Sequence, residues 1–238
     1  LSQKYGFKVI EDASHALGAN YKKVPIGGDD RSLACIFSFH PVKMITTGEG
    51  GALILGCEEM FERAKRVRSH GINYLNNNHN IKKDRPWYYE QYELGYNYRI
   101  TEIQAAMGIV QISRLSSFVR RRNEISKLYK EKLKNLPLKF QLIDGNSLCS
   151  YHLFTVKITD KNYDRDELFR FLKSHKIASQ VHYIPVYHQP FYRSLGFSKD
   201  YCENVEEYFS SCLSIPLHQK LDEGDIDFVA KKLTNFFS

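Results

Sequence analysis

Short apolar runs alternate with polar segments along the first hundred residues of the chain. Three of the runs have the length and composition of buried strands, at residues 7–12, 33–38 and 51–56. A helical spacing of apolar residues follows over 58–69, and Gly71 can adopt the left-handed conformation that ends such a helix. Strands and helices in this order predict an α/β domain. Three strands are few for such a domain, so we expect the chain to be the C-terminal part of a longer protein.

A different pattern covers the middle of the chain. Residues 72–97 show no periodicity and are too many for an ordinary connection, which predicts a functional or subunit-contacting loop. Apolar residues at helical spacing then predict one helix over 101–116 and a second, charged helix over 119–136. The chain between these two helices is the expected place for a domain boundary.

The second part of the chain mixes strand and helix patterns. We place the boundary after residue 117, so that residues 1–117 and 118–238 form separate domains. In the second domain the pattern predicts strands at 151–158 and 178–183 and helices at 164–175, 204–212 and 222–236. This order predicts a small α+β domain beside the α/β one.

Composition narrows the class of protein. The chain has 238 residues, of which 42% are hydrophobic, and this is enough for a packed core. No apolar run approaches the ~18 residues of a membrane span. Five cysteines without a CxxC pair indicate reduced thiols, and therefore a cytoplasmic protein. The chain lacks an HExxH motif, and His182 and His188 have no carboxylate between them, so we expect no metal site.

The net charge of +7 has two open explanations. Basic residues gather at 82–85 and at 120–122, each with acidic residues nearby. They could form solvated helix faces, or they could attract an anionic ligand such as a nucleotide diphosphate. No nucleic-acid-binding motif accompanies them, so we do not expect binding to nucleic acid.

Candidate chemistry lies where the first two predicted strands end. The first strand ends in Asp12, and the second ends at Ser38, five residues before Lys43. Ligand sites in α/β proteins lie at the carboxyl ends of neighbouring strands, so we expect these side chains to share one edge of the sheet. Pyridoxal phosphate (PLP) needs an amine for its Schiff base, an acid for its pyridine nitrogen and donors for its phosphate. Lys43 could still be an ordinary surface lysine, and Asp12 could cap a turn.

The sequence also resembles a known family along nearly its whole length. The segments that carry the resemblance are EDASHALGA at 11–19, FSFHPVK at 37–43, TTGEGGA at 46–52, RSHGI at 68–72, ELGYNYR at 93–99, QVHYIPVY at 180–187 and LSIPLH at 213–218. They are similar to the DegT-type sugar-nucleotide aminotransferases, and within that family to its pseudaminic-acid branch. The resemblance implies a fold type I PLP-dependent transferase. Residues 1–117 would then form an incomplete large α/β cofactor domain, and residues 118–238 the small α+β domain.

The resemblance also implies a role for each candidate residue. Lys43 would form the Schiff base and carry the proton, while Asp12 would pair with the pyridine nitrogen. His15 would contact the cofactor ring, and Ser38 its phosphate. Asn97 would reach the phosphate of the neighbouring subunit's cofactor, which implies a homodimer with shared active sites. His15 could instead be a core histidine, and Asn97 could form an Asx turn before the next helix.

The substrates come from the same resemblance. His182 and Tyr183 match positions that face the sugar. The implied reaction moves an amino group from an amino acid, with glutamate as the expected donor, to C4 of a UDP-linked 4-keto-6-deoxy-N-acetylhexosamine. Related dehydratases carry histidine where this chain has Lys43, so transamination is favoured. Another keto nucleotide sugar remains an alternative acceptor, and a non-catalytic fragment that binds or regulates a partner remains an alternative function.

Overall fold

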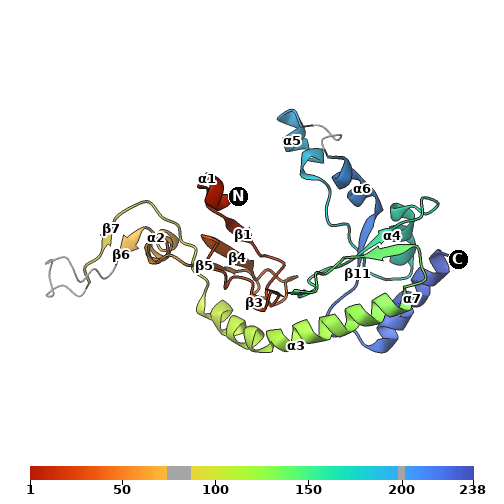
Figure 1. Cartoon of the computed structure of the whole chain (residues 1–238). Coiled ribbons are helices and arrows are strands. Elements are labelled where there is room, and N and C mark those ends of the chain that lie inside the picture. The colour runs from red at the N-terminus through yellow and green to blue at the C-terminus, as the bar shows by residue number, and fades with distance from the viewer. Residues whose placement is uncertain (74–86, 198–201) are drawn as a thin grey trace. The chain divides into compact units, whose positions relative to one another are not determined.

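The computed structural model describes residues 1–73, 87–197 and 202–238 (Figure 1). Contacts within the chain form two compact units, Leu1–Leu115 and Ser116–Ser238. The division falls inside one long helix, close to the predicted boundary after residue 117. That each side of this boundary is a separate functional domain stays a prediction.

A three-stranded sheet organises unit 1. The chain begins with the short helix α1 (Ser2–Tyr5). The sheet consists of β1 (Ile10–Asp12), β4 (Ala34–Ser38) and β5 (Gly51–Leu55), in the order β1-β4-β5. The three predicted strands are therefore confirmed, although β1 is shorter than its apolar run. β1 and β4 are parallel, whereas β5 runs antiparallel to β4. The carboxyl ends of β1 and β4 consequently lie at the same edge of the sheet.

The two faces of this sheet differ in burial. Cys35 and Phe37 on one face are buried with Ala13 in a small core. On the other face, Ile36 and Leu53 lie in register with each other and are 40% and 49% exposed. Asp12 is in register with Ile36, so its side chain belongs to this second, exposed face.

Very short strands complete unit 1. A hairpin pairs β2 (Asn20–Tyr21) with β3 (Val24–Pro25), and a second antiparallel pair joins β6 (Ile72–Asn73) to β7 (Glu90–Gln91). Strands of two residues are too short to give a periodic signal, so the sequence predicted none of them. The second pair also gives structure to the ends of the predicted loop over 72–97. The asparagine-rich and basic clusters of that loop, at 76–80 and 82–85, lie outside the described residues.

Besides α1, two described helices belong to unit 1, in whole or in part. The predicted helix over 58–69 is α2 (Glu58–Arg68), whose acidic first turn and basic last turn both suit the helix dipole. The predicted pair of helices over 101–116 and 119–136 is wrong, because a single helix, α3 (Glu102–Lys132), spans both. Residues 115–118 contain serines but neither glycine nor proline, and serine costs a helix only a few tenths of a kcal/mol. Thr101 and Gln104 exchange hydrogen bonds as a capping box at its start.

Unit 2 is a small antiparallel sheet covered by helices. The order β11-β10-β8 joins β11 (Cys212–Ile215), β10 (Phe154–Ile158) and β8 (Leu138–Phe140). Strand β9 (Ser147–Leu148) is separate from it. Residues of this sheet, of α3, of α4 (Arg165–Ser174) and of α7 (Glu223–Phe236) form one large core. The side chain of Asp164 caps the start of α4, and that of Asp222 caps the start of α7. The predicted strand over 151–158 and the helices over 164–175 and 222–236 are confirmed within a few residues.

The segment between α4 and β11 differs most from its prediction. It holds the short helices η1 (Val186–His188) and α5 (Pro190–Ser194), and then α6 (Glu203–Ser211). The predicted strand over 178–183 is wrong, since only one isolated bridge, Gln180 to Ser214, forms there. Its residues alternate in type as a strand would, but the chain leaves the sheet edge directly afterwards. The sequence also missed β11, because its four residues follow the helix α6 without a turn.

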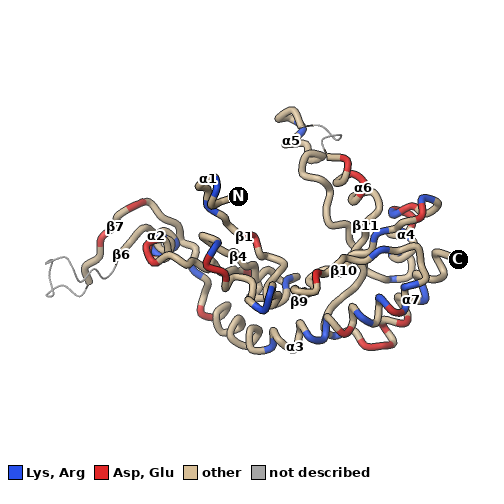
Figure 2. Tube along the Cα trace, viewed as in Figure 1, with Lys and Arg blue, Asp and Glu red and all other residues tan. Residues whose placement is uncertain are grey.

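The basic cluster at 120–122 is only partly a solvated helix face. Acidic and basic residues are interleaved along the C-terminal half of α3 (Figure 2). Arg122, however, is only 5% exposed, and its Nη1 donates to the carbonyl oxygens of Tyr151 at 2.8 Å and Leu217 at 2.9 Å. Burial lowers its pKa to about 10. This arginine therefore ties α3 to two loops of unit 2, and the expectation of a solvated cluster is wrong for it.

Two further observations concern chemistry and environment. All five cysteines are free thiols. Among the described helices, none combines the length and the apolarity needed to cross a bilayer.

One buried tyrosine predicts a gain in stability. Tyr129 is 0% exposed and stacks on Phe154, yet its hydroxyl has no hydrogen-bond partner among the described residues. We expect Tyr129→Phe to raise the free energy of unfolding by about 1 kcal/mol, because it removes a desolvated hydroxyl and keeps the ring. Urea denaturation followed by circular dichroism measures the change. Tyr163→Phe is the matched control, since the Tyr163 hydroxyl donates to the Phe237 carbonyl at 2.9 Å, and its loss should lower stability. Equal effects of the two substitutions would contradict the explanation.

Candidate active site

The carboxyl ends of β1 and β4 bring the first candidate residues together. Asp12 ends β1 and lies in register with Ile36 of β4, two residues before Ser38. Ser38 ends β4, and its Oγ accepts a hydrogen bond of 3.3 Å from the backbone N–H of His40. The expectation that both side chains share one sheet edge is therefore confirmed.

Asp12 is held as a carboxylate by its neighbours. The Ser14 hydroxyl donates to Asp12 Oδ1 at 2.5 Å, and the Ser14 backbone N–H donates to the same oxygen at 3.1 Å. These two bonds lower the pKa of Asp12, and the charges of His15 and Lys43 lower it further. Asp12 therefore caps a turn, which was the alternative to a cofactor role. The turn nevertheless leaves its carboxylate exposed and ionised. Ser14 is not among the residues predicted from the sequence, although Asp-x-Ser is a common signal of such a turn.

Lys43 lies in a tightly held turn after β4. Its side chain is half-buried, and its backbone N–H donates to the His40 carbonyl at 2.9 Å. The next two residues, Met44 and Ile45, are buried at 3% and 2% exposure, which anchors the turn in unit 1. The positive charge of Lys43 is one of the smaller causes that lower the pKa of Asp12.

A network of polar contacts fixes the loop that follows Lys43. Thr46 Oγ1 donates to the Phe39 carbonyl at 3.0 Å and accepts from the Gly48 N–H at 2.9 Å. The buried Thr47 donates to the Glu49 carbonyl at 2.7 Å, and Gln104 of α3 donates to the same carbonyl at 2.9 Å. The glycine-rich segment is therefore a structural turn that α3 supports.

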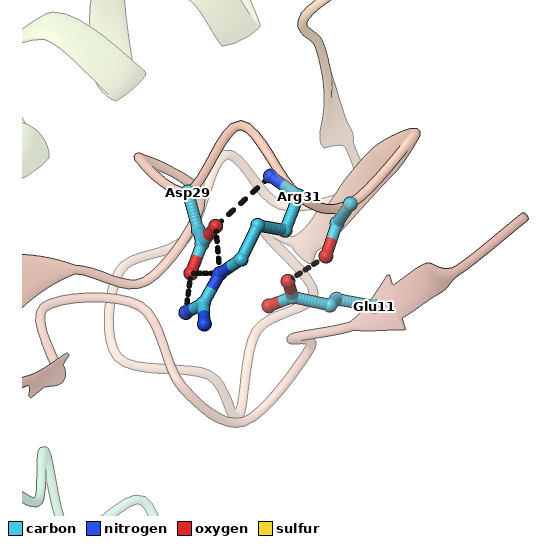
Figure 3. A network of polar contacts seen from close by, with 4 residues as sticks. Glu11, Asp29 and Arg31 are labelled. Carbon is cyan, nitrogen blue, oxygen red and sulfur yellow. Dashed lines mark hydrogen bonds and ion pairs between the residues drawn. The ribbon is translucent and has the colours of Figure 1, made fainter. Parts of the chain in front are cut away.

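The neighbouring carboxylate, Glu11, has a different role. Its carboxylate accepts a hydrogen bond from the Ser32 hydroxyl, on the opposite face of β1 from Asp12. In the adjacent loop Arg31 Nε donates to both oxygens of Asp29, at 2.8 and 2.9 Å, which lowers the pKa of Asp29 to about 2 (Figure 3). These contacts stabilise the loop before β4, so Glu11 is a structural residue.

Asn97 lies at a separate point of unit 1, against the end of α2. The chain at the end of α2 and the segment that carries Asn97 lie close together, and two glycines allow this approach. A Cβ on Gly71 would lie 1.7 Å from the Glu93 carbonyl oxygen, and a Cβ on Gly95 would lie 2.2 Å from the Gly71 nitrogen. Backbone hydrogen bonds of 2.7 to 2.9 Å join the two segments, and Asn97 itself forms an isolated bridge with Ser69. Its backbone is thus fixed while its side chain is exposed.

His182 and Tyr183 belong to unit 2. His182 Nδ1 lies 2.9 Å from Ser214 Oγ, and Tyr183 is 62% exposed. The structure thus places Asp12 and Ser38 at one sheet edge, His15 shortly after β1 and Lys43 in the turn after β4. Asn97 lies elsewhere in unit 1, and the pair 182–183 belongs to unit 2. The roles given to these residues stay predictions.

The group at the sheet edge fits PLP chemically. An ionised carboxylate beside an amine suits a protonated pyridine ring that carries an aldehyde, and the Ser38 hydroxyl can donate to a phosphate. Among the residues that the structure describes, no three His, Cys, Asp or Glu side chains cluster as metal ligands do.

Comparisons with known proteins agree with this chemistry. The sequence profile of the DegT/DnrJ/EryC1/StrS aminotransferase family matches residues 1–234. A Campylobacter jejuni protein named UDP-4-amino-4,6-dideoxy-N-acetyl-beta-L-altrosamine transaminase is 39% identical over 235 residues, which cover 98% of this chain and 59% of that protein. The chain therefore spans about three-fifths of the length of that relative.

Solved structures give the same fold. PseC of Helicobacter pylori, an aminotransferase involved in the biosynthesis of pseudoaminic acid, is 30% identical with a TM-score of 0.86, over 99% of this chain and 61% of PseC. Spr1654 of Streptococcus pneumoniae, in its PLP form, is 26% identical with a TM-score of 0.85, over 96% of this chain and 57% of that one. The fold is accordingly that of the fold type I PLP-dependent transferases.

Proposed function

Since the chain belongs to the DegT/DnrJ/EryC1/StrS aminotransferase family, we propose that its protein is a PLP-dependent sugar-nucleotide aminotransferase. The reaction moves an amino group from an amino acid, with glutamate as the expected donor, to C4 of a UDP-linked 4-keto-6-deoxy-N-acetylhexosamine. The observation that carries this proposal is that Asp12 and Ser38 end two neighbouring parallel strands, with Lys43 in the turn that directly follows the second of them. The names of the Campylobacter jejuni and Helicobacter pylori relatives support the substrate class.

Each residue at the sheet edge has a defined task in this reaction. When bound, PLP supplies an electron sink for the carbon that loses its proton. Lys43 Nζ would hold the cofactor at its carbonyl carbon and, once the donor's amine has replaced it there, would take the proton from the donor's Cα. Asp12 keeps the pyridine nitrogen protonated through its negative charge. Ser38 binds the phosphate and His15 contacts the ring.

The substrate and the setting complete the proposal. We expect His182 and Tyr183 to contact the sugar nucleotide. Five free thiols agree with a reducing cytoplasm, where we place the protein. Amination of another keto nucleotide sugar is the alternative reaction of the same site.

The test is a direct assay of the product. The protein is incubated with PLP, glutamate and a panel of UDP-linked and other keto nucleotide sugars, and each product is identified by mass spectrometry and NMR. Amination at C4 of the UDP-linked 4-keto-6-deoxy-N-acetylhexosamine supports the proposal. Amination of a different nucleotide sugar alone would select the alternative. Absence of amine transfer to any of the sugars, with folded protein and bound PLP, would overturn both.

Asn97 leads to a proposal about assembly, namely a homodimer in which it serves the partner's site. Its exposed side chain lies between Tyr96 and Tyr98, whose rings stack 4.6 Å apart and are 56% and 71% exposed. An exposed aromatic pair beside a fixed polar residue is typical of a subunit interface. The side chain could then reach a cofactor phosphate across the interface.

Complementation between two inactive variants tests the shared site. Lys43→Ala and Asn97→Ala proteins are prepared separately and mixed under conditions that allow subunit exchange. If Asn97 serves the partner's site, one site of the mixed dimer carries both defects and the other carries none. Activity should then return to about half per mixed dimer. With both single variants inactive and exchange verified by mass, no recovery would show that Asn97 serves its own site.

A further inference from the structure

His182 is fixed in unit 2 by two kinds of contact with β11. Its Nδ1 lies 2.9 Å from Ser214 Oγ. The backbones of Gln180 and Ser214 also exchange hydrogen bonds of 3.0 and 2.8 Å, which pin the chain two residues before the imidazole. Ser214 is only 5% exposed, so its hydroxyl makes its contacts with protein groups. A buried serine thus lies at hydrogen-bond distance from the imidazole and helps to orient it.

The Ser214 hydroxyl has a second neighbour. Thr155 of β10 is its register partner, and the two hydroxyl oxygens are 3.3 Å apart. A serine hydroxyl has one proton and must donate it to one neighbour. The imidazole nitrogen is closer than the threonine oxygen, and in the tautomer where Nδ1 carries no proton it is also the more basic acceptor. The two distances therefore favour donation of the Ser214 proton to His182 Nδ1.

We propose that Ser214 is a positioning residue that donates to Nδ1 of His182 and thereby keeps the imidazole proton on Nε2. The hydrogen bond made at one ring nitrogen decides which tautomer is present. With its proton on Nε2, His182 is a hydrogen-bond donor at that nitrogen, which suits a phosphate or hydroxyl oxygen of a sugar nucleotide. This last point rests on the proposed function, whereas the tautomer itself does not.

The tautomer can be measured in the whole chain by NMR. The 238-residue protein is labelled with 15N-histidine, and the signals of His182 among the nine histidines are identified by their loss in His182→Gln. At a pH where the ring is neutral, we expect a protonated Nε2 and a bare Nδ1. A protonated Nδ1 in the wild-type protein would overturn the proposal without any variant.

Variants then test whether Ser214 is the cause. Ser214→Ala should convert the His182 signals to those of mixed tautomers. Ser214→Cys keeps nearly the same volume, but its thiol is a weak hydrogen-bond donor, so it should shift the His182 signals in the same direction. This variant covers the case in which the alanine variant does not fold. Ser179→Ala is the matched control, because Ser179 is 7% exposed and its hydroxyl has no partner among the described residues. An unchanged His182 tautomer in folded Ser214→Ala or Ser214→Cys would overturn the proposal.

Kinetics separate this inference from the proposed function. In the active protein, Ser214→Ala should raise KM for the sugar nucleotide by up to about tenfold, the value of one hydrogen bond, and leave the half-reaction with the amino donor unchanged. A changed tautomer with an unchanged KM would keep Ser214 as the positioning residue and remove His182 from substrate binding.

Discussion

Replacement of Lys43 by alanine is expected to reduce amine transfer by about 10⁴-fold or more. Alanine has no Nζ to bind the cofactor carbonyl or to take the proton from the amino donor. Turnover with PLP, glutamate and the keto sugar nucleotide measures the loss. The mass of the protein after borohydride treatment gives a second result, since wild type should gain the reduced cofactor and Lys43→Ala should not.

Lys8 provides the control for this experiment. It is an exposed lysine in the loop before β1, so Lys8→Ala removes the same side chain from the same unit without touching the sheet edge. This variant should keep both its turnover and the covalent mass increase. Borohydride-fixed cofactor in Lys43→Ala, attached to a different lysine, would contradict the assignment of Lys43.

Replacement of Asp12 by asparagine should slow both half-reactions by about 10³-fold while PLP stays bound. The amide is uncharged and cannot keep the pyridine nitrogen protonated, whereas Lys43 and Ser38 remain in place to hold the cofactor. Single-turnover absorbance measurements with glutamate, and then with the keto sugar, follow each half-reaction. A wild-type rate in either half-reaction would remove Asp12 from the pyridine nitrogen.

Glu11→Gln is a close control, because the same chemical change is made one residue away. Glu11 lies on the opposite face of β1 and is bonded to Ser32. Its substitution should affect the stability of the loop before β4 and leave the chemical step unchanged. A comparable loss of rate in both variants would point to distortion of β1 instead of a specific charge at Asp12.

The sequence predicted the sheet edge because two strong signals coincide there. Apolar runs defined β1 and β4, and parallel strands necessarily bring their carboxyl ends, with Asp12 and Ser38, to the same edge. An apolar run carries no information about strand direction. The parallel direction of β1 and β4 is an assumption that comes with the predicted α/β class, and that class does not reveal that β5 runs antiparallel.

Other features depend on tertiary contacts that no local pattern encodes. Arg122 has the sequence environment of a solvated helix, and only the carbonyl groups of distant loops make its burial possible. Ser214 lies in a strand of four residues, and its contact with His182 joins positions 32 residues apart. The single helix α3 appeared as two because the serines at 116 and 117 interrupt its apolar spacing without breaking its backbone.

The two glycines beside Asn97 have a consequence for the natural and laboratory variation of this protein. Any side chain at Gly71 or Gly95 would push apart the segments that carry Ser69 and Asn97. Saturation mutagenesis should therefore find almost no tolerated substitution at either position. The two glycines should be as intolerant as a reacting residue, although neither has a functional group. Second-site suppressors should also be rare, because the obstructing atoms belong to the backbone, which substitution elsewhere cannot remove.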